Sequence, residues 1–251
     1  MPRPDFAVIS DFKIDDIFSN KKEIRIGTPY GPTRKMILSK SEDYEIVFLA
    51  RREIEDEVLG KYNYRANIWG LNKIGIDRII SLNNYRALDK KYAIGDIVIP
   101  NNLIDYANNL HQSFSDKLLI TPVDLNEPFC SDLRNCLIRP SKSIPNKVWN
   151  KSIVACMGIC RFETTTERKL LIVQGSNLTN IGMSPEIFLS RELRMCYCSL
   201  GIVCSKPIAL NEKGIEESVK IEEALNASKQ ILKKCFTRIP KEKGCSCSIS
   251  E

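Results

Sequence analysis

The chain has 251 residues, of which 43% are apolar and 27% charged, and its 37 basic and 31 acidic side chains give a net charge of +6. This composition is that of a soluble globular protein, and it excludes disordered, collagen-like and disulfide-scaffold classes. A chain of this length can bury a core without disulfides or a metal. No apolar run approaches the roughly 20 residues that cross a bilayer, and residues 1–13 lack a signal peptide's apolar block. We therefore expect a cytoplasmic protein with no membrane partner.

The positive charge is spread along the chain, with one dense basic stretch at Lys233–Lys243. Cys235, Phe236 and Pro240 interrupt it, and it lacks the interleaved stacking aromatics of a nucleic-acid-binding surface. A solvated tail is the favoured interpretation, so binding to nucleic acid is not expected.

The ten cysteines do not form a recognisable metal-binding pattern. There is no Cys-x-x-Cys pair, and the single histidine, His111, is near no cysteine, so we predict no metal site and no cofactor. Several cysteines lie inside apolar stretches, where cysteine usually acts as a small hydrophobic residue. These are Cys156, Cys196, Cys198 and Cys204. Cys245-Ser246-Cys247 differs because it lies in a polar tail, where it could cross-link to another cysteine.

Short apolar runs rich in β-branched residues recur along the chain and predict strands. Their near-continuous hydrophobicity indicates burial on both faces, as in a parallel or mixed sheet covered by helices. The predicted strands are Tyr44–Leu49, Arg78–Ser81, Asp96–Pro100, Lys117–Thr121, Ser152–Met157, Lys169–Gln174 and Cys198–Cys204. The fold class is therefore α/β, with a mixed central sheet flanked by helices.

Two segments predict helices by their apolar spacing. Asn63–Ile74 places Ala66, Trp69 and Leu71 on one side and is followed by Gly75 as a stop signal. Residues 215–235 repeat apolar positions at helical spacing against a charged face. Residues 103–116 and 124–152 are rich in Asn, Ser and Pro and predict loops with short helices. With no repeat or linker, we expect one domain over residues 1–251, of which 241–251 is a polar, Cys-containing tail.

General catalytic motifs are missing from the sequence. It contains no P-loop, no Gly-x-Gly-x-x-Gly, no Gly-x-Ser-x-Gly and no histidine pair for a metal. His111 lies in a polar stretch without an identifiable partner, so we interpret it as a surface residue.

A series of specific strings in a specific order does carry functional information. The strings are Thr28-Pro29-Tyr30-Gly31, Asn63-Tyr64-Arg65-Ala66-Asn67-Ile68-Trp69, Arg78-Ile79-Ile80-Ser81, Ile94-Gly95-Asp96-Ile97-Val98-Ile99-Pro100, Glu127-Pro128-Phe129-Cys130, Arg161-Phe162, Gly182-Met183-Ser184-Pro185-Glu186 and Met195-Cys196-Tyr197-Cys198-Ser199. Together they resemble the methylthioadenosine phosphorylase and purine nucleoside phosphorylase family from about Ala7 to Pro240. The terminal Cys245-Ser246-Cys247 is also similar to the tail of some archaeal members, in which such cysteines form disulfides.

The resemblance implies a reaction and an assembly. Family members are trimers or hexamers that cleave the N-glycosidic bond of a purine nucleoside or methylthioadenosine with inorganic phosphate as co-substrate. Such chemistry needs donors for a phosphate dianion, an oriented sugar and a polar group at the purine N7. The expected partners are thus a purine nucleoside, phosphate and further copies of the chain or an active paralogue.

The phosphate-binding motifs of the family are largely replaced in this chain. The glycine-rich loop is aligned with Ser10-Asp11-Phe12-Lys13, where Asp11 would repel a phosphate and Lys13 could offset part of that repulsion. The Arg-His-Gly element appears as Arg51-Arg52-Glu53, so Arg51 is at the arginine position. The Ser/Thr-Ala pair appears as Asn83-Asn84, and Arg86 fills the small-residue turn that follows.

The nucleoside-binding motifs of the family are present in part. The resemblance assigns Arg161, Phe162 and Met183 to the nucleoside and Arg51, Thr164 and Ser184 to phosphate. The N7-binding Asn or Asp is absent, and Ser205 is the hydrogen-bonding residue at that position, a poor substitute.

Three hypotheses follow. The favoured one is a family member with weak or lost phosphorolysis that acts as a nucleoside-binding protein or oligomer subunit. The second is an active phosphorylase with a rebuilt site, which uses Arg51, Arg52, Thr164 and Ser184 for phosphate and Ser205 or Asn83 at the base or sugar. The third is an unrelated regulatory role through the basic tail.

Overall fold

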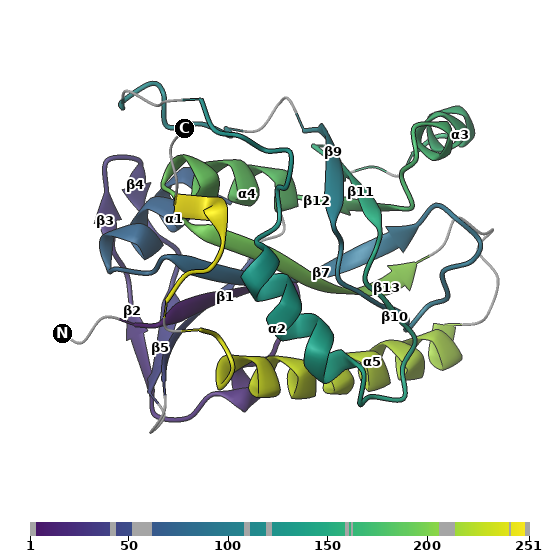
Figure 1. Ribbon diagram of the computed structural model, residues 1–251, viewed down its shortest axis with the longest axis horizontal. Coiled ribbons are helices and arrows are strands. Elements are labelled where there is room, and N and C mark those ends of the chain that lie inside the picture. The colour runs from purple at the N-terminus through teal and green to yellow at the C-terminus, as the bar shows by residue number, and fades with distance from the viewer. Residues whose placement is uncertain are drawn as a thin grey trace.

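The computed structural model describes residues 4–40, 44–51, 62–107, 111–118, 122–158, 161, 163–205, 214–240 and 242–248. Within these ranges, five α-helices flank a mixed sheet of eleven strands (Figure 1). The predicted α/β class with a mixed central sheet is thus confirmed.

The sheet contains β1 (Phe6–Ser10), β2 (Lys21–Ile24), β5 (Met36–Lys40), β6 (Glu45–Ala50), β7 (Arg78–Ala87), β8 (Ile97–Val98), β9 (Asn102–Tyr106), β10 (Val148–Trp149), β11 (Ile153–Met157), β12 (Leu178–Ile181) and β13 (Cys196–Ser205). A separate hairpin joins β3 (Gly27–Thr28) and β4 (Gly31–Pro32). The helices are α1 (Tyr64–Lys73), α2 (Ser131–Ser141), α3 (Thr165–Val173), α4 (Met183–Glu192) and α5 (Gly214–Phe236). Two short 3-10 helices, η1 (Asp15–Ile17) and η2 (Ser246–Ser248), complete the described elements.

The centre of the sheet is parallel. Strands β6, β1, β7 and β13 are neighbours in that order and run in the same direction, while β5 and β8 add antiparallel partners on either side. The carboxyl ends of the four parallel strands therefore meet at one edge, which is where open α/β sheets usually bind ligands.

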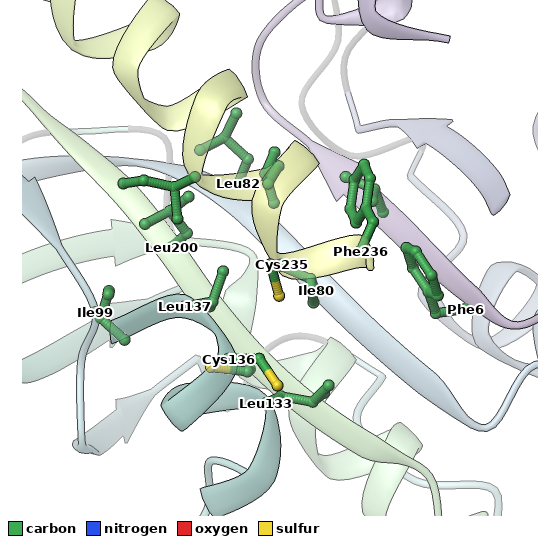
Figure 2. Packing of buried hydrophobic residues seen from close by; sticks show 14 of the residues in the cluster. Phe6, Ile80, Leu82, Ile99, Leu133, Cys136, Leu137, Leu200, Cys235 and Phe236 are labelled. Carbon is green, nitrogen blue, oxygen red and sulfur yellow. The ribbon is translucent and has the colours of Figure 1, made fainter. Parts of the chain in front are cut away.

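Each central strand is buried on both faces. On β1, Phe6 and Val8 pack into the core with α2 and α5, whereas Ala7 and Ile9 pack with α1 and α4. Figure 2 shows the first of these cores, where Phe6 lies beside Phe236 of α5, with ring centroids 4.8 Å apart. The continuous apolar runs in the sequence reflect this burial on both faces.

Both predicted helices are confirmed. The Asn63 side chain caps α1 by accepting a hydrogen bond from the Ala66 amide at 3.0 Å, and Gly75 follows the helix with a φ of +94°. The periodic segment near the C-terminus forms α5. Most predicted strands also coincide with observed ones, although β7 and β13 extend further than expected.

One predicted strand is wrong, and a second lies mostly outside the described residues. Lys169–Gln174 is the end of helix α3 and its C-cap, because a capping box of Thr164 and Glu167 starts the helix at Thr165, four residues before Lys169. In Lys117–Thr121, Lys117 and Leu118 lie in a turn, and the remaining three residues are outside the described ranges.

Other elements were not among those predicted. Most of strand β9 falls in a segment predicted as loop, because Asn102 and Asp105 flank its short apolar pair, Leu103 and Ile104, and none of its residues is fully buried. Helix α2 occupies part of the segment expected to hold only short helices, and β1, β2, β5, β12 and α4 were also absent from the predicted set. In the part of the chain that the structure describes, no helix is both long and apolar enough to span a bilayer.

Candidate functional site

Polar side chains gather just beyond the ends of β1 and β6, where side chains of β7, β13 and helix α4 meet them. We define the Arg51 cluster as Asp11, Arg51, Asn83, Glu186 and Tyr197. Arg51, Asn83 and Glu186 are each at most 4% exposed, so these groups interact with one another away from solvent.

The parallel pairing of β1 and β6 brings Asp11 and Arg51 together. Ser10 and Ala50 are register partners at the ends of these strands, and Asp11 and Arg51 are the next residues. The Arg51 amide donates to the Ser10 carbonyl at 2.8 Å, and the Asp11 amide donates to the Leu82 carbonyl of β7 at 2.9 Å. Backbone pairing thus fixes both residues at the sheet edge.

The guanidinium of Arg51 is surrounded by protein acceptors. Its Nε and Nη2 donate to Oε1 and Oε2 of Glu186, both at 2.8 Å, in a bidentate pair. Its Nη1 donates to Asn83 Oδ1 at 2.8 Å and lies 2.8 Å from Asp11 Oδ1. Tyr197 donates its hydroxyl to Glu186 Oε2 at 2.8 Å. This arrangement uses the planar geometry through which arginine recognises anions.

The cluster has a formal charge of −1, from one arginine and two carboxylates. Burial alone would lower the pKa of Arg51, but the nearby carboxylates of Asp11 and Glu186 raise that pKa well above its usual value. Arg51 therefore stays charged and is neutralised from within the chain.

A second set of polar contacts continues from Asn83 along β7 and β13. Asn83 Nδ2 donates to Ser81 Oγ at 2.7 Å and Ser199 Oγ at 2.6 Å. The Tyr85 hydroxyl lies 2.6 Å from Ser199 Oγ and 3.5 Å from the Met183 sulfur. Burial raises the pKa of Tyr85, so its phenol remains neutral.

The start of α4 places Met183 and Glu186 at this edge. Gly182 precedes the helix with a φ of +96°, and a Cβ atom there would lie 2.5 Å from the Tyr64 hydroxyl. The glycine therefore permits both the backbone turn and the close approach of α1. Asn180 Oδ1 accepts from the Met183 amide at 3.1 Å and fixes the first turn.

The residues assigned to phosphate from the sequence occupy different environments. Arg51 is at the centre of the cluster, and Ser184 is fully buried in the first turn of α4 near the Cys156 thiol. Thr164 is exposed, and its hydroxyl caps α3 by accepting from the Glu167 amide at 3.2 Å. Its observed contact is thus structural, and a role in binding phosphate stays a prediction.

The residues assigned to the nucleoside also occupy different environments. Met183 lies against Asn83 and Tyr85, whereas Arg161 is exposed and forms a bidentate pair with Glu167 at 2.7 and 2.8 Å. Phe162 lies outside the described residues. Ser205 is the half-buried last residue of β13, in register with Arg86 of β7. The nucleoside roles of these residues stay predictions.

Sequence reasoning missed the pairing that defines the cluster. It expected Asp11 to face a bound phosphate and Lys13 to offset its charge, but Lys13 is exposed and Arg51 pairs with Asp11. Glu186 belongs to the Gly182–Glu186 string but was given no role. One feature of the sequence could have indicated this pair: Asp11 and Arg51 each directly follow a buried strand. Adjacent parallel strands bring the residues at their carboxyl ends close together.

The fold is that of the nucleoside phosphorylases. A methylthioadenosine phosphorylase from an Antarctic soil metagenomic library superposes with a TM-score of 0.88 at 21% identity, covering 99% of this chain and 91% of that one. The apo methylthioadenosine phosphorylase of Schistosoma mansoni gives a TM-score of 0.82 at 21% identity, covering 92% and 90%.

Sequence comparison establishes the family. The chain belongs to the phosphorylase superfamily, whose family model matches residues 9–237. It is 33% identical to a probable 6-oxopurine nucleoside phosphorylase of Thermococcus kodakarensis, over 98% of this chain and 96% of the relative. It is 29% identical to the S-methyl-5'-thioadenosine phosphorylase of Pyrococcus furiosus, again over 98% and 96%. The resemblance found in the sequence is confirmed.

Proposed function

We propose that this chain binds a purine nucleoside but does not catalyse its phosphorolysis, because the Asp11 carboxylate occupies the place of the phosphate anion. The relatives named above as 6-oxopurine nucleoside and methylthioadenosine phosphorylases support purine nucleosides, including methylthioadenosine, as the ligand class. Phosphate is a co-substrate of that reaction, so a site closed to phosphate leaves binding without turnover.

The distance of 2.8 Å between Asp11 Oδ1 and Arg51 Nη1 is the observation that carries the proposal. A phosphate approaching Arg51 would have to displace Asp11 or lie beside it. At roughly 4 Å and an effective dielectric constant of about 20, each pair of like unit charges costs about 4 kcal/mol. Glu186 holds two further N–H groups of Arg51, so few donors remain for a ligand.

The part of the proposed site that would contact the purine base also lacks a strong catalytic group. Ser205 stands where the resemblance places an acid or amide for N7, and a hydroxyl stabilises a departing anionic base poorly. Losing one preorganised donor from a transition-state site costs about 3 kcal/mol, and Asp11 adds its repulsion of phosphate. Binding, in contrast, requires neither leaving-group stabilisation nor a nucleophile.

Release of free base tests the catalytic half of the proposal. Purified protein is incubated for a long period with methylthioadenosine, adenosine, inosine or guanosine, with and without phosphate. We expect phosphate to cause no release above the buffer control. Phosphate-dependent release would contradict the proposal and support the alternative, an active phosphorylase with a rebuilt site.

Calorimetric titration with the same nucleosides tests the binding half. We expect at least one of them to bind, and Met183→Leu to weaken that binding by removing the sulfur that contacts Asn83 and Tyr85. Met195→Leu is the matched control, since Met195 is equally buried and the substitution conserves volume. Equal affinities for the two variants, or no binding to the unaltered chain, would count against a nucleoside site at Met183.

A further inference from the structure

Four cysteine sulfurs converge on one point on the α2 side of the sheet, on the opposite face from the Tyr197 side chain of the Arg51 cluster. The Sγ atoms of Cys130, Cys196, Cys245 and Cys247 all lie within 4.8 Å of one another. The Cys196 and Cys245 sulfurs are 3.4 Å apart. Cys130, Cys196 and Cys247 are buried, and Cys245 is half-buried.

Three separate segments supply these sulfurs, and hydrogen bonds fix each segment. Cys130 caps the start of α2, and its amide donates to the Tyr197 carbonyl at 2.8 Å. Cys196 begins β13, and its amide donates to the Asp77 carbonyl at 2.8 Å. The backbone therefore holds two of the four thiols in place independently of the tail.

The C-terminal segment is held against the same place by polar contacts. The Gly244 amide donates to Asp132 Oδ2 at 2.8 Å, and Lys243 Nζ lies 3.1 Å from Asp77 Oδ2. Helix η2 then carries Cys247, of which 6% is exposed, into the core. A chain segment expected to be a polar tail thus contributes two sulfurs to a buried cluster.

A buried arginine, Arg191, lies near the four sulfurs. Arg191 is 7% exposed, and its Nε and Nη1 have no hydrogen-bond partner among the described residues, while its Nη2 donates to the Asp124 carbonyl at 3.3 Å. Arg191 also interacts electrostatically with Cys247. An anionic group here would compensate the guanidinium, whereas neutral thiols or disulfides would leave it buried without a counter-charge.

We propose that these four cysteines bind one zinc ion as a structural tetrathiolate site. Tetrahedral zinc with bonds of about 2.3 Å places its sulfur ligands about 3.8 Å apart, which the observed convergence accommodates. Four thiolates and one Zn²⁺ carry a formal charge of −2, which the nearby Arg191 and the N-terminus of α2 at Cys130 would partly offset. Zinc would fasten the C-terminal segment to β13 and α2.

Zinc binding by the reduced protein tests this site. The full chain is purified anaerobically under reducing conditions, exposed to zinc with a competing chelator, and its bound metal is measured. We expect one zinc per chain, an increase in Tm on binding, and visible absorption bands of tetrahedral thiolate coordination when Co²⁺ replaces zinc. A Cys245→Ser/Cys247→Ser variant should lose all three, since it keeps the folded core but removes two ligands.

A matched control separates this site from the other buried thiols. Cys136 and Cys235 are close neighbours in the α2–α5 core (Figure 2), so Cys136→Ser/Cys235→Ser should retain the zinc, with Tm reporting any loss of folding. If the fully reduced chain holds no more zinc than the Cys245→Ser/Cys247→Ser variant, the proposal is wrong. Two disulfides among the four sulfurs in anaerobically isolated protein would also overturn it.

Discussion

Asp11 and Arg51 show how a carboxylate of the same chain can occupy an arginine that would otherwise be open to an anion. Arg51 is the residue at which the family resemblance places a phosphate ligand, yet its Nη1 is 2.8 Å from a carboxylate of its own chain. Because burial removes competing water, such a pair acts as a fixed part of the structure. Asp11 also accepts from the Asn84 amide at 3.0 Å, which orients its carboxylate.

Removing Arg51 should cost far more stability than neutralising Asp11. Arg51→Met leaves two buried carboxylates without a cation, and breaking a buried pair in this way typically costs about 3–5 kcal/mol. Asp11→Asn keeps an acceptor and leaves the balanced pair of Arg51 and Glu186, so we expect a smaller loss. Urea unfolding measures the free energy of unfolding of both variants. A larger loss of stability for Asp11→Asn than for Arg51→Met would contradict this description of the charge balance.

At the scale of an element, helix α3 shows that Thr164, a residue assigned to phosphate from the sequence, makes a structural contact. Thr164 and Glu167 form a capping box, and Arg161 pairs with the same glutamate. We expect Thr164→Ala to lower the free energy of unfolding by about 1 kcal/mol, the usual cost of a lost cap. Thr165→Ala, one residue further into the helix, is the control, and equal losses would argue against the cap.

The pKa of Glu167 provides a second test of this element. Hydrogen bonds from Arg161 and from the Thr164 amide lower that pKa from 4.5 to about 2. A depressed carboxyl pKa stabilises the fold above the unfolded value, so this contribution is complete above about pH 4.5 and is lost as the pH falls towards 2. An NMR titration should find the low midpoint and a higher one in Arg161→Gln. A midpoint near 4.5 in the unaltered chain would show that the pair does not persist in solution.

The elements that the sequence predicted well are those whose own residues determine them. Helix α1 carries its cap and stop residues, and β13 is a continuous apolar run. Strand β9 and the helix at Lys169–Val173 were missed because their formation depends on neighbours: β9 pairs with β11, and α3 is started by a capping box outside the apolar run. The same reasoning applies to the Arg51 cluster, because the positions of Asp11 and Arg51 after buried strands can be read from the sequence, but not that these two strands are neighbours.

At the scale of the whole molecule, α3 presents apolar side chains to solvent. Leu170, Ile172 and Val173 are 54%, 41% and 84% exposed, and the helix lies at the periphery of the fold (Figure 1). Adjacent exposed apolar residues of this kind favour association with another subunit. The oligomer expected from the family resemblance is thus a prediction with a specific candidate surface.

Analytical ultracentrifugation tests that surface. We expect the chain to sediment as a homo-oligomer and Leu170→Glu/Val173→Glu to shift it towards monomer, because the new carboxylates would be buried in the contact. Val219→Glu on α5 is the control, since Val219 is also exposed, at 50%, but lies on a different helix. An unchanged mass for the α3 variant would place the contact elsewhere.

The proposed loss of phosphorolysis depends on Asp11 filling the anion position, so direct titration with inorganic phosphate is its most direct test. Calorimetry would compare the unaltered chain with Asp11→Gly and with Asp16→Gly, which removes an exposed carboxylate of the same segment. We predict no phosphate binding by the unaltered chain or Asp16→Gly, and measurable binding by Asp11→Gly. Phosphate binding by the unaltered chain as tight as that of Asp11→Gly would contradict the account.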